Sequence, residues 1–212
     1  LYFASWNWCV KRALYDDHRA VDFSILPFDK LDEVLSVNKG IMSKGYRVLY
    51  DSNANLLESR IRTAIETIEE PAPEIPTEKE LRNDVNNLLF HIIWTFKKIK
   101  KGELWAAVRC INTYIRDLLL RLIEFHNASV TKRSGVVMYG GRFLEDRTDG
   151  EILGQLKRCF AKYDEQDAIE TLGHLVDVVY SISKGLFEAL GYQLDAEQFE
   201  AIRKMYAEMQ AA

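Results

Sequence analysis

The chain has 212 residues, of which 48% are hydrophobic and 28% are charged, a composition typical of soluble globular proteins. This length allows one large domain or two smaller ones, each with its own core. The formal net charge of -4 gives no electrostatic argument for nucleic-acid binding, which usually needs a strongly basic surface. No apolar run reaches the roughly 18 residues of a membrane span. We therefore expect a cytoplasmic protein that binds neither nucleic acid nor membrane.

The first quarter of the chain predicts two strands and two helices. Segments 8–15 and 21–27 are rich in aromatic and β-branched residues and flank the turn-forming sequence DDHRA, which predicts an antiparallel hairpin. An amphipathic helix is expected after Pro27. The sequence YRVLYDS then predicts a short strand or extended segment, and NANLLESRIRTAIETIEE predicts a second helix that begins at an asparagine cap.

Three of the four prolines fall in the sequence PAPEIP, and they stiffen an extended linker that excludes helix. We place the domain boundary there, with one domain at 1–72 and a second at 73–212. Five amphipathic segments with short connections predict a helical bundle in the second domain. These segments are 77–102, 103–128, 149–164, 165–192 and 195–209. The predicted fold class is α+β, with a mostly antiparallel helical bundle after an α/β part.

Asp22 is a lone carboxylate in the second predicted strand. Side chains alternate along a strand, so Asp22 and Ser24 share one face while Val21, Phe23 and Ile25 share an apolar face. A carboxylate in a sheet core is costly without a cationic partner. Asp22 is therefore either a ligand of a metal or substrate, or a residue of a solvated face, and the spacing leaves both open.

The sequence WTFKKIKKGELWAAVR gathers four lysines and an arginine around a predicted helix junction. Such a group suits polyphosphate oxygens. Alternatively, Lys97 and Lys101 complement the carbonyl end of the first long helix, and Glu103 complements the start of the next. In the sequence YGGRFLED, two glycines permit close approach of a ligand whose phosphate Arg142 would hold, or they simply separate a loop from a helix.

Four segments in this order resemble the aminoglycoside 6-adenylyltransferase (streptomycin adenylyltransferase) family of polymerase β-like nucleotidyltransferases. They are RAVDFSILP, the proline-rich exit, WTFKKIKKGELWAA and YGGRFLED with LGQLKRCFAKYD. The resemblance runs over nearly the whole chain, and the order of the motifs carries more weight than any one of them. It implies that residues 1–72 are the C-terminal part of a nucleotidyltransferase domain and that the bundle binds substrate and nucleotide.

The resemblance further implies transfer of AMP from ATP with Mg²⁺ to a hydroxyl of a small polycationic acceptor such as streptomycin. In the family a D-x-D after a G-S turn holds magnesium, and a third carboxylate on a neighbouring strand also acts as general base. Asp22 matches this third position, so the resemblance gives it the metal-binding and catalytic roles. The 212 residues contain no G-S turn followed by D-x-D. We expect that part upstream of Leu1, and its loss is the alternative.

The resemblance also assigns residues of the bundle. It implies nucleotide binding by Lys97, Lys101 and Arg142, and acceptor binding by Glu103 and Trp94. An acidic surface suits a polycation, and one predicted helix offers several carboxylates. These are Glu103, Asp117 and Glu124.

Two other functions remain open at this point. The sequence RLIEFH, from Arg121 to His126, matches the loose pattern of helical-bundle ribonucleases, although Leu122 stands where a polar residue is usual. A toxin–antitoxin or regulatory protein would present this sequence in a groove, whereas a non-catalytic binding module would lack the metal-binding carboxylates. A monomer or a homodimer is expected.

Overall fold

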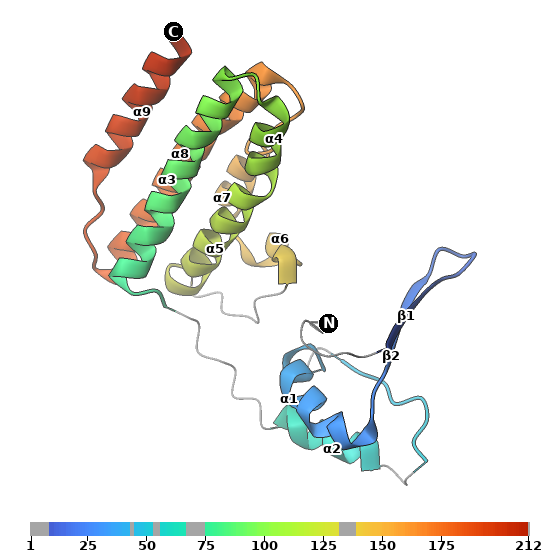
Figure 1. Cartoon of the computed structure of the whole chain (residues 1–212). Helices are drawn as coiled ribbons and strands as arrows, with labels where there is room; N and C mark the ends of the chain where they lie inside the picture. Colours follow the sequence, from blue (N-terminus) through green and yellow to red (C-terminus); the bar gives the residue numbers. More distant parts are fainter. Residues whose placement is uncertain (1–8, 43–44, 53–55, 67–74, 132–138, 212) are drawn as a thin grey trace. The chain divides into compact units, whose positions relative to one another are not determined.

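The computed structural model describes residues 9–42, 45–52, 56–66, 75–131 and 139–211. The chain divides into two compact units, Leu1–Pro71 and Ala72–Ala212, which are described separately (Figure 1). The first holds a two-stranded antiparallel sheet and two helices, and the second is a bundle of helices. This confirms the expected α+β class with a helical bundle. Within the described ranges, none of the helices has the length and apolar character needed to span a bilayer.

The predicted hairpin is present at the start of the first unit. Strands β1 (Cys9–Leu14) and β2 (Ala20–Ile25) pair antiparallel, in a register that sets Arg12 opposite Asp22. The turn that joins them places His18 at a φ of 66°, a left-handed conformation that tight turns require. The strand register therefore follows from the short turn, and it decides which side chains meet across the ribbon.

The apolar face of β2 is not buried as a sheet core. Phe23 is 47% exposed and Ile25 is 60% exposed, while Val21 is half-buried. Among the described residues the sheet has two strands only, and a two-stranded ribbon lacks the layers needed to cover a face. The sequence pattern identified the strand correctly, but burial does not follow the expected alternation, because Phe23 and Ile25 are exposed while Ser24 on the face of Asp22 is half-buried.

Two helices complete the first unit. A 3-10 turn, η1 (Phe28–Lys30), leads into α1 (Leu31–Met42), which packs against α2 (Leu56–Glu66). Their contact buries a small apolar core, to which Val34, Leu35 and Ile61 belong among the residues that the structure describes.

The connection between α1 and α2 differs in part from expectation. Residues 45–52 form no strand, so the extended alternative for YRVLYDS describes them better. The expected asparagine cap of α2 lies outside the described residues. Asp51 instead accepts the backbone N–H of Leu57 at 2.8 Å and satisfies one of the free donors at the start of α2.

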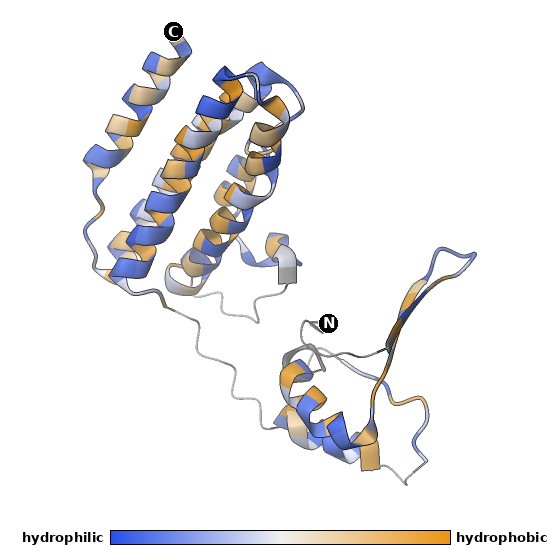
Figure 2. Cartoon of the chain, in the orientation of Figure 1, coloured by the Kyte–Doolittle hydropathy of each residue, from blue (hydrophilic) through white to orange (hydrophobic). Residues whose placement is uncertain are grey.

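The second unit is built from α3 (Glu78–Lys100), α4 (Leu104–Asn112), α5 (Tyr114–Ser129), η2 (Tyr139–Gly141), α6 (Leu144–Arg147), α7 (Gly150–Leu156), α8 (Glu165–Leu190) and α9 (Ala196–Ala211). Helix α3 packs against α4, α5 and α8, and α9 lies on α8. Figure 2 shows both hydrophobic and hydrophilic residues along these helices, as expected for amphipathic helices around a core. The largest buried side chains include Leu88, Ile92, Phe96, Ile115, Leu119 and Phe187.

Helix α3 begins and ends where the sequence predicted. Thr77 and Glu80 form a capping box, in which the Thr77 Oγ1 accepts the Glu80 N–H and the Glu80 carboxylate accepts the Thr77 N–H at 2.9 Å. Gly102 follows the helix at a φ of 76°, and the Glu103 N–H donates to the Lys98 carbonyl at 3.0 Å. This is the Schellman arrangement that a glycine after a helix permits.

The expected continuous helix over 103–128 is wrong, because the chain breaks at Thr113 into α4 and α5. Thr113 has φ -125° and ψ -82°, outside the helical region. The preceding residue, Asn112, donates to the Ala161 carbonyl at 2.7 Å and accepts the Ala161 N–H at 3.1 Å. This pair of hydrogen bonds holds the loop before α8 against the helix junction, a long-range constraint that helical periodicity cannot reveal.

The predicted helix over 149–164 is also shorter than expected. Asp149 caps α7 by accepting the Glu151 N–H at 2.8 Å, and the helix ends at Leu156. The chain then turns, and Cys159 is fully buried in the bundle core. Cys159 and Ala161 thus fill the core from a loop rather than from a helix, whereas Phe160 in the same loop is exposed.

Candidate functional site

Asp22 meets a cation on the neighbouring strand. The Arg12 guanidinium donates from Nε to the Asp22 Oδ1 at 2.7 Å and from Nη2 to Oδ2 at 3.1 Å. The hydrogen bond from Arg12 lowers the pKa of Asp22 below its ordinary value. Both side chains are exposed. Asp22 is thus an oriented, ionised and solvent-exposed carboxylate, on the face of β2 opposite to Phe23 and Ile25, with Arg12 as the partner that the sequence analysis missed.

Among the described residues, Asp22 has no neighbouring carboxylate, histidine or cysteine groups that would complete a cluster of metal ligands. None of the His, Cys, Asp and Glu side chains in the described ranges gather in groups of three or more that could hold a metal ion. Asp22 is one carboxylate, and Arg12 engages both of its oxygens. Magnesium is usually bound through one or two carboxylates together with waters and substrate phosphates. A metal ligand at Asp22 would therefore need further oxygen donors and would have to compete with Arg12.

In the bundle, Trp94 and Glu103 come together through Lys98. Trp94 lies on α3 and is 37% exposed. The Lys98 Nζ lies 5.2 Å from the centre of the Trp94 ring and 2.7 Å from a carboxylate oxygen of Glu103. Glu103 is the residue before α4, and its side chain makes no cap hydrogen bond. The two predicted acceptor-binding residues therefore both contact the ammonium group of Lys98. Lys98 lies one helical turn after Trp94, and this spacing could have identified it as a partner of Trp94 from the sequence.

The three predicted nucleotide-binding residues lie in two separate parts of the bundle. Lys97 and Lys101 are exposed at the C-terminal end of α3. Arg142 is exposed between η2 and α6, in a segment that lies beside the middle of α5, where Gly141 packs against Leu120. Figure 1 shows α6 toward the opposite end of the bundle from the end of α3. The structure pairs the two lysines and separates Arg142 from them.

A group of aromatic rings extends from Trp94 along the surface of α3. The His91 ring lies 6.3 Å from the Trp94 ring and 4.5 Å from the Tyr114 ring at the start of α5. Phe90 contacts His91 edge to face at 5.1 Å and is 62% exposed. Asn87 donates to the Tyr114 hydroxyl at 3.1 Å. The sequence analysis missed this surface. The pattern that could have identified it is the group of aromatic residues on the face of α3 that points away from the hydrophobic core.

The predicted acidic helix surface is not formed as expected. The break at Thr113 separates Glu103 from Asp117 and Glu124, and Glu103 is paired with Lys98. Glu124 is half-buried, and this burial raises the pKa of its carboxyl above the ordinary value.

Arg121 and His126 contact different helices. Arg121 pairs with Asp84 of α3 at 3.1 Å. His126 packs against α8, where a β-carbon on Gly185 would lie 3.3 Å from the His126 Nε2, and burial lowers the pKa of this histidine. The sequence RLIEFH therefore does not present its two polar ends together.

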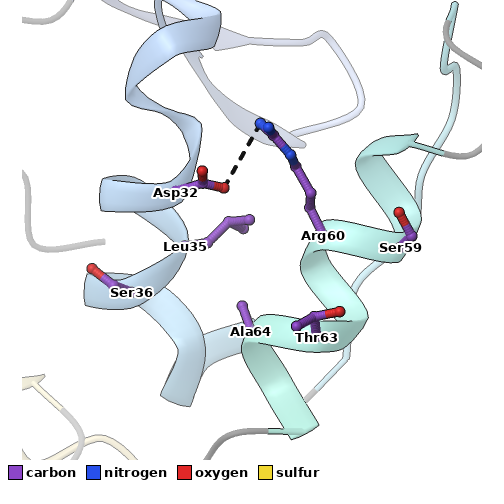
Figure 3. A pocket seen from close by; sticks show the side chains of 7 residues that line it. All are labelled: Asp32, Leu35, Ser36, Ser59, Arg60, Thr63 and Ala64. Carbon is purple, nitrogen blue, oxygen red and sulfur yellow. Dashed lines mark ion pairs between the residues drawn. The ribbon is translucent and has the colours of Figure 1, made fainter.

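Two surface cavities lie away from the predicted residues. In the first unit, a pocket of about 320 Å³ lies between α1 and α2, and the Asp32–Arg60 ion pair of 3.7 Å spans it (Figure 3). Figure 3 shows Leu35 and Ala64 between the two helices, so the floor is apolar. In the bundle, a groove of about 490 Å³ between α8 and α9 is lined by Glu170, His174, Asp177, Arg203 and Tyr206, among others. Neither contains a residue that the sequence analysis selected.

Known proteins give the context for these residues. Residues 4–209 match the family described as Streptomycin adenylyltransferase. Among solved structures, an aminoglycoside 6-adenyltransferase from Bacillus subtilis has a similar fold, with a TM-score of 0.60 and 17% sequence identity over 97% of this chain and 72% of that chain. No curated protein matches the chain. Because the family match covers almost all 212 residues, the chain belongs to the streptomycin adenylyltransferase family.

Proposed function

We propose that this protein transfers AMP from Mg-ATP to a hydroxyl of a small polycationic acceptor, with aminoglycosides such as streptomycin as the acceptor class. The observation that carries the proposal is the family match over residues 4–209. The similar fold of an aminoglycoside 6-adenyltransferase supports it at the level of architecture. In this reaction the acceptor oxygen forms a bond to the α-phosphorus, the bond to the β-phosphate oxygen breaks, and pyrophosphate leaves.

Asp22 is proposed as the carboxylate that receives the proton of the acceptor hydroxyl. Its exposure and fixed orientation on β2 support this role. Asp22 is ionised at neutral pH, which is the state that a proton acceptor needs, but its lowered pKa makes it a weaker base than an ordinary aspartate. We therefore propose that an acceptor hydroxyl displaces part of the Arg12 contact, which returns basicity to the carboxylate. Magnesium enters as part of the Mg-ATP substrate.

Lys97 and Lys101 are proposed to bind the ATP phosphates. Both are exposed and lie four residues apart at the end of α3, so they present two ammonium groups on one side of the helix. Arg142 is proposed as a second phosphate-binding residue, since an arginine suits phosphate oxygens well. Arg142 lies away from the two lysines, so one triphosphate would contact either the lysine pair or Arg142. ATP binding by variants of the two lysines and by a variant of Arg142 would show which of these positions holds the phosphates.

The aromatic surface of α3 and Glu103 are proposed to bind the acceptor. Trp94 offers a ring face and Glu103 a carboxylate, and both attract cations. The neighbouring rings of His91 and Tyr114 would contact the carbon skeleton of a sugar or cyclitol. The nuclease alternative has less support, because Arg121 and His126 contact different helices.

Pyrophosphate release by the intact gene product tests this function. The protein is incubated with ATP and Mg²⁺ and a panel of aminoglycosides that includes streptomycin. We expect release that depends on the acceptor and that falls at least about 100-fold in Asp22→Asn, the usual loss when a general base is removed. Asp16→Asn is the matched control, since Asp16 is an exposed carboxylate in the same hairpin. Equal rates in the two variants would remove Asp22 from the mechanism.

A further inference from the structure

We propose that Trp94 and Glu103 form a binding site for an organic ammonium group and that the side chain of Lys98 fills this site in the free protein. The inference rests on the proposed function in one respect, namely that the ammonium ligand is the acceptor. Lys98 is then a specificity-determining residue, because an acceptor must displace its ammonium before it binds. The family match assigns no role to Lys98, and the sequence analysis included it only in a group of lysines that suits polyphosphate oxygens.

The contacts of Lys98 define the chemistry of the site. Its Nζ lies 5.2 Å from the centre of the Trp94 ring and 2.7 Å from the Glu103 Oε2. A π face and a carboxylate that meet at one point select a cation, because the ring quadrupole and the carboxylate both attract positive charge. A phosphate or carboxylate ligand would be repelled by both. The ligand class is therefore an organic ammonium.

Two of the three residues are held in place by the backbone. Trp94 lies within α3, and Glu103 is fixed by the turn after it, where the Glu103 N–H donates to the Lys98 carbonyl at 3.0 Å and the Gly102 N–H donates to the Ile99 carbonyl at 2.8 Å. The Lys98 side chain is a flexible four-carbon stem that can rotate away. The backbone thus sets the Trp94 ring and the Glu103 side chain next to each other, and the ammonium between them is replaceable.

The cost of displacing Lys98 is small. Its side chain is 25% exposed and that of Glu103 is 42% exposed, so the ion pair lies at the surface, where such pairs contribute little. The exposed cation–π contact is of similar strength. Together these two contacts would reduce the apparent affinity for an ammonium ligand by roughly 5- to 20-fold, because the ligand has to compete with Lys98.

Neighbouring rings indicate where the rest of the ligand would lie. The His91 ring is 6.3 Å from the Trp94 ring, and the Tyr114 ring is 4.5 Å from His91. A carbon ring that carries the ammonium group would rest on this surface, and the Tyr114 hydroxyl and Asn87, which are hydrogen-bonded at 3.1 Å, offer polar contacts for its hydroxyls. An amino-substituted cyclitol or sugar fits this combination of charge, ring face and polar groups.

Calorimetric titration with 2-deoxystreptamine, a cyclitol with two ammonium groups, tests the inference without ATP. We expect Lys98→Met to bind this probe roughly 5- to 20-fold more tightly than the wild type. Lys100→Met is the matched control, because Lys100 is an exposed lysine in the same helical turn that lies 5.9 Å from the ring centre of the buried Phe96 instead. It should bind the probe as the wild type does. Circular dichroism establishes that each variant is folded.

A second pair of variants identifies the site. In the Lys98→Met background, Glu103→Gln and Trp94→Leu should each remove the gain in affinity, and myo-inositol, which has the hydroxyls without the ammonium groups, should not bind. Equal affinities of Lys98→Met and Lys100→Met for 2-deoxystreptamine would overturn the inference. It would also be overturned if none of the variants bound this probe. Neither result would affect the AMP-transfer proposal, because pyrophosphate release with ATP is measured separately.

Discussion

The Arg12 guanidinium holds both carboxylate oxygens of Asp22 across the two strands of the hairpin, at 2.7 and 3.1 Å. Arg12 and Asp22 are directly opposite in the strand register, so the contact follows from the hairpin itself. The ion pair orients the one carboxylate that the family pattern places near the reacting groups. It also means that any ligand of Asp22 competes with an arginine of the same protein.

The first prediction concerns the ionisation of Asp22. Replacing Arg12 by glutamine removes the charged donor, so the pKa of Asp22 should rise toward its ordinary value. The carboxyl carbon of Asp22, followed by NMR through an acid titration, reports this shift. Arg19→Gln is the control, because Arg19 contacts Asp17 in the turn instead. An unchanged titration of Asp22 in Arg12→Gln would show that the pair is not formed in solution.

A second prediction concerns the start of α3. Thr77→Ala removes the hydroxyl that accepts the Glu80 N–H, so the free energy of unfolding should fall by about 1 kcal/mol. Urea denaturation measures the change. Lys79→Ala, at an exposed position in the same first turn, should stay within about 0.5 kcal/mol of the wild type. Similar values for both variants would contradict the capping box.

The third prediction concerns the last helix. Phe199 on α9 is fully buried and meets the Tyr180 ring of α8 edge to face at 5.1 Å. Phe199→Ala should lower the free energy of unfolding by about 3–5 kcal/mol, because the change leaves a cavity. Met205→Ala, on the same helix but partly exposed, should cost much less. If Phe199→Ala had no effect, α9 would not pack on the bundle as described.

The fourth prediction concerns pH. Burial lowers the pKa of His126 below 6.5, so the folded protein binds a proton there less readily than the unfolded chain does. The stability associated with neutral His126 is present above pH 6.5 and is lost as the pH falls toward the lowered pKa. Replacing His126 by glutamine should therefore flatten the decline in stability from pH 7 to pH 5. An equally steep decline in the variant would contradict this assignment.

Local signals predicted several parts of the fold, and long-range contacts decided the parts that were missed. The hairpin and both ends of α3 follow from nearby residues, such as the turn after Tyr15 and the Thr77 cap. The break at Thr113 depends on hydrogen bonds between Asn112 and Ala161, which are 49 residues apart. No periodicity in α4 and α5 reports that contact.

In the candidate site too, the sequence predicted some residues and missed others. The family pattern identified Asp22, Trp94 and Glu103 by type and order, and their roles remain predictions. The cation opposite each carboxylate is set by local geometry that the sequence analysis did not use, because the hairpin register pairs Arg12 with Asp22 and the turn after α3 brings Lys98 to Glu103. The separation of Arg142 from the lysines of α3 depends instead on how the bundle is connected.

The most direct test of the central claim is mass spectrometry of the acceptor after incubation of the intact gene product with ATP, Mg²⁺ and streptomycin or a related aminoglycoside. We predict a product that is heavier by one adenylyl group, formed by the wild type and by Asp16→Asn and absent from Asp22→Asn. If the wild type leaves every acceptor of the panel unmodified, the adenylyl-transfer account of this chain is contradicted.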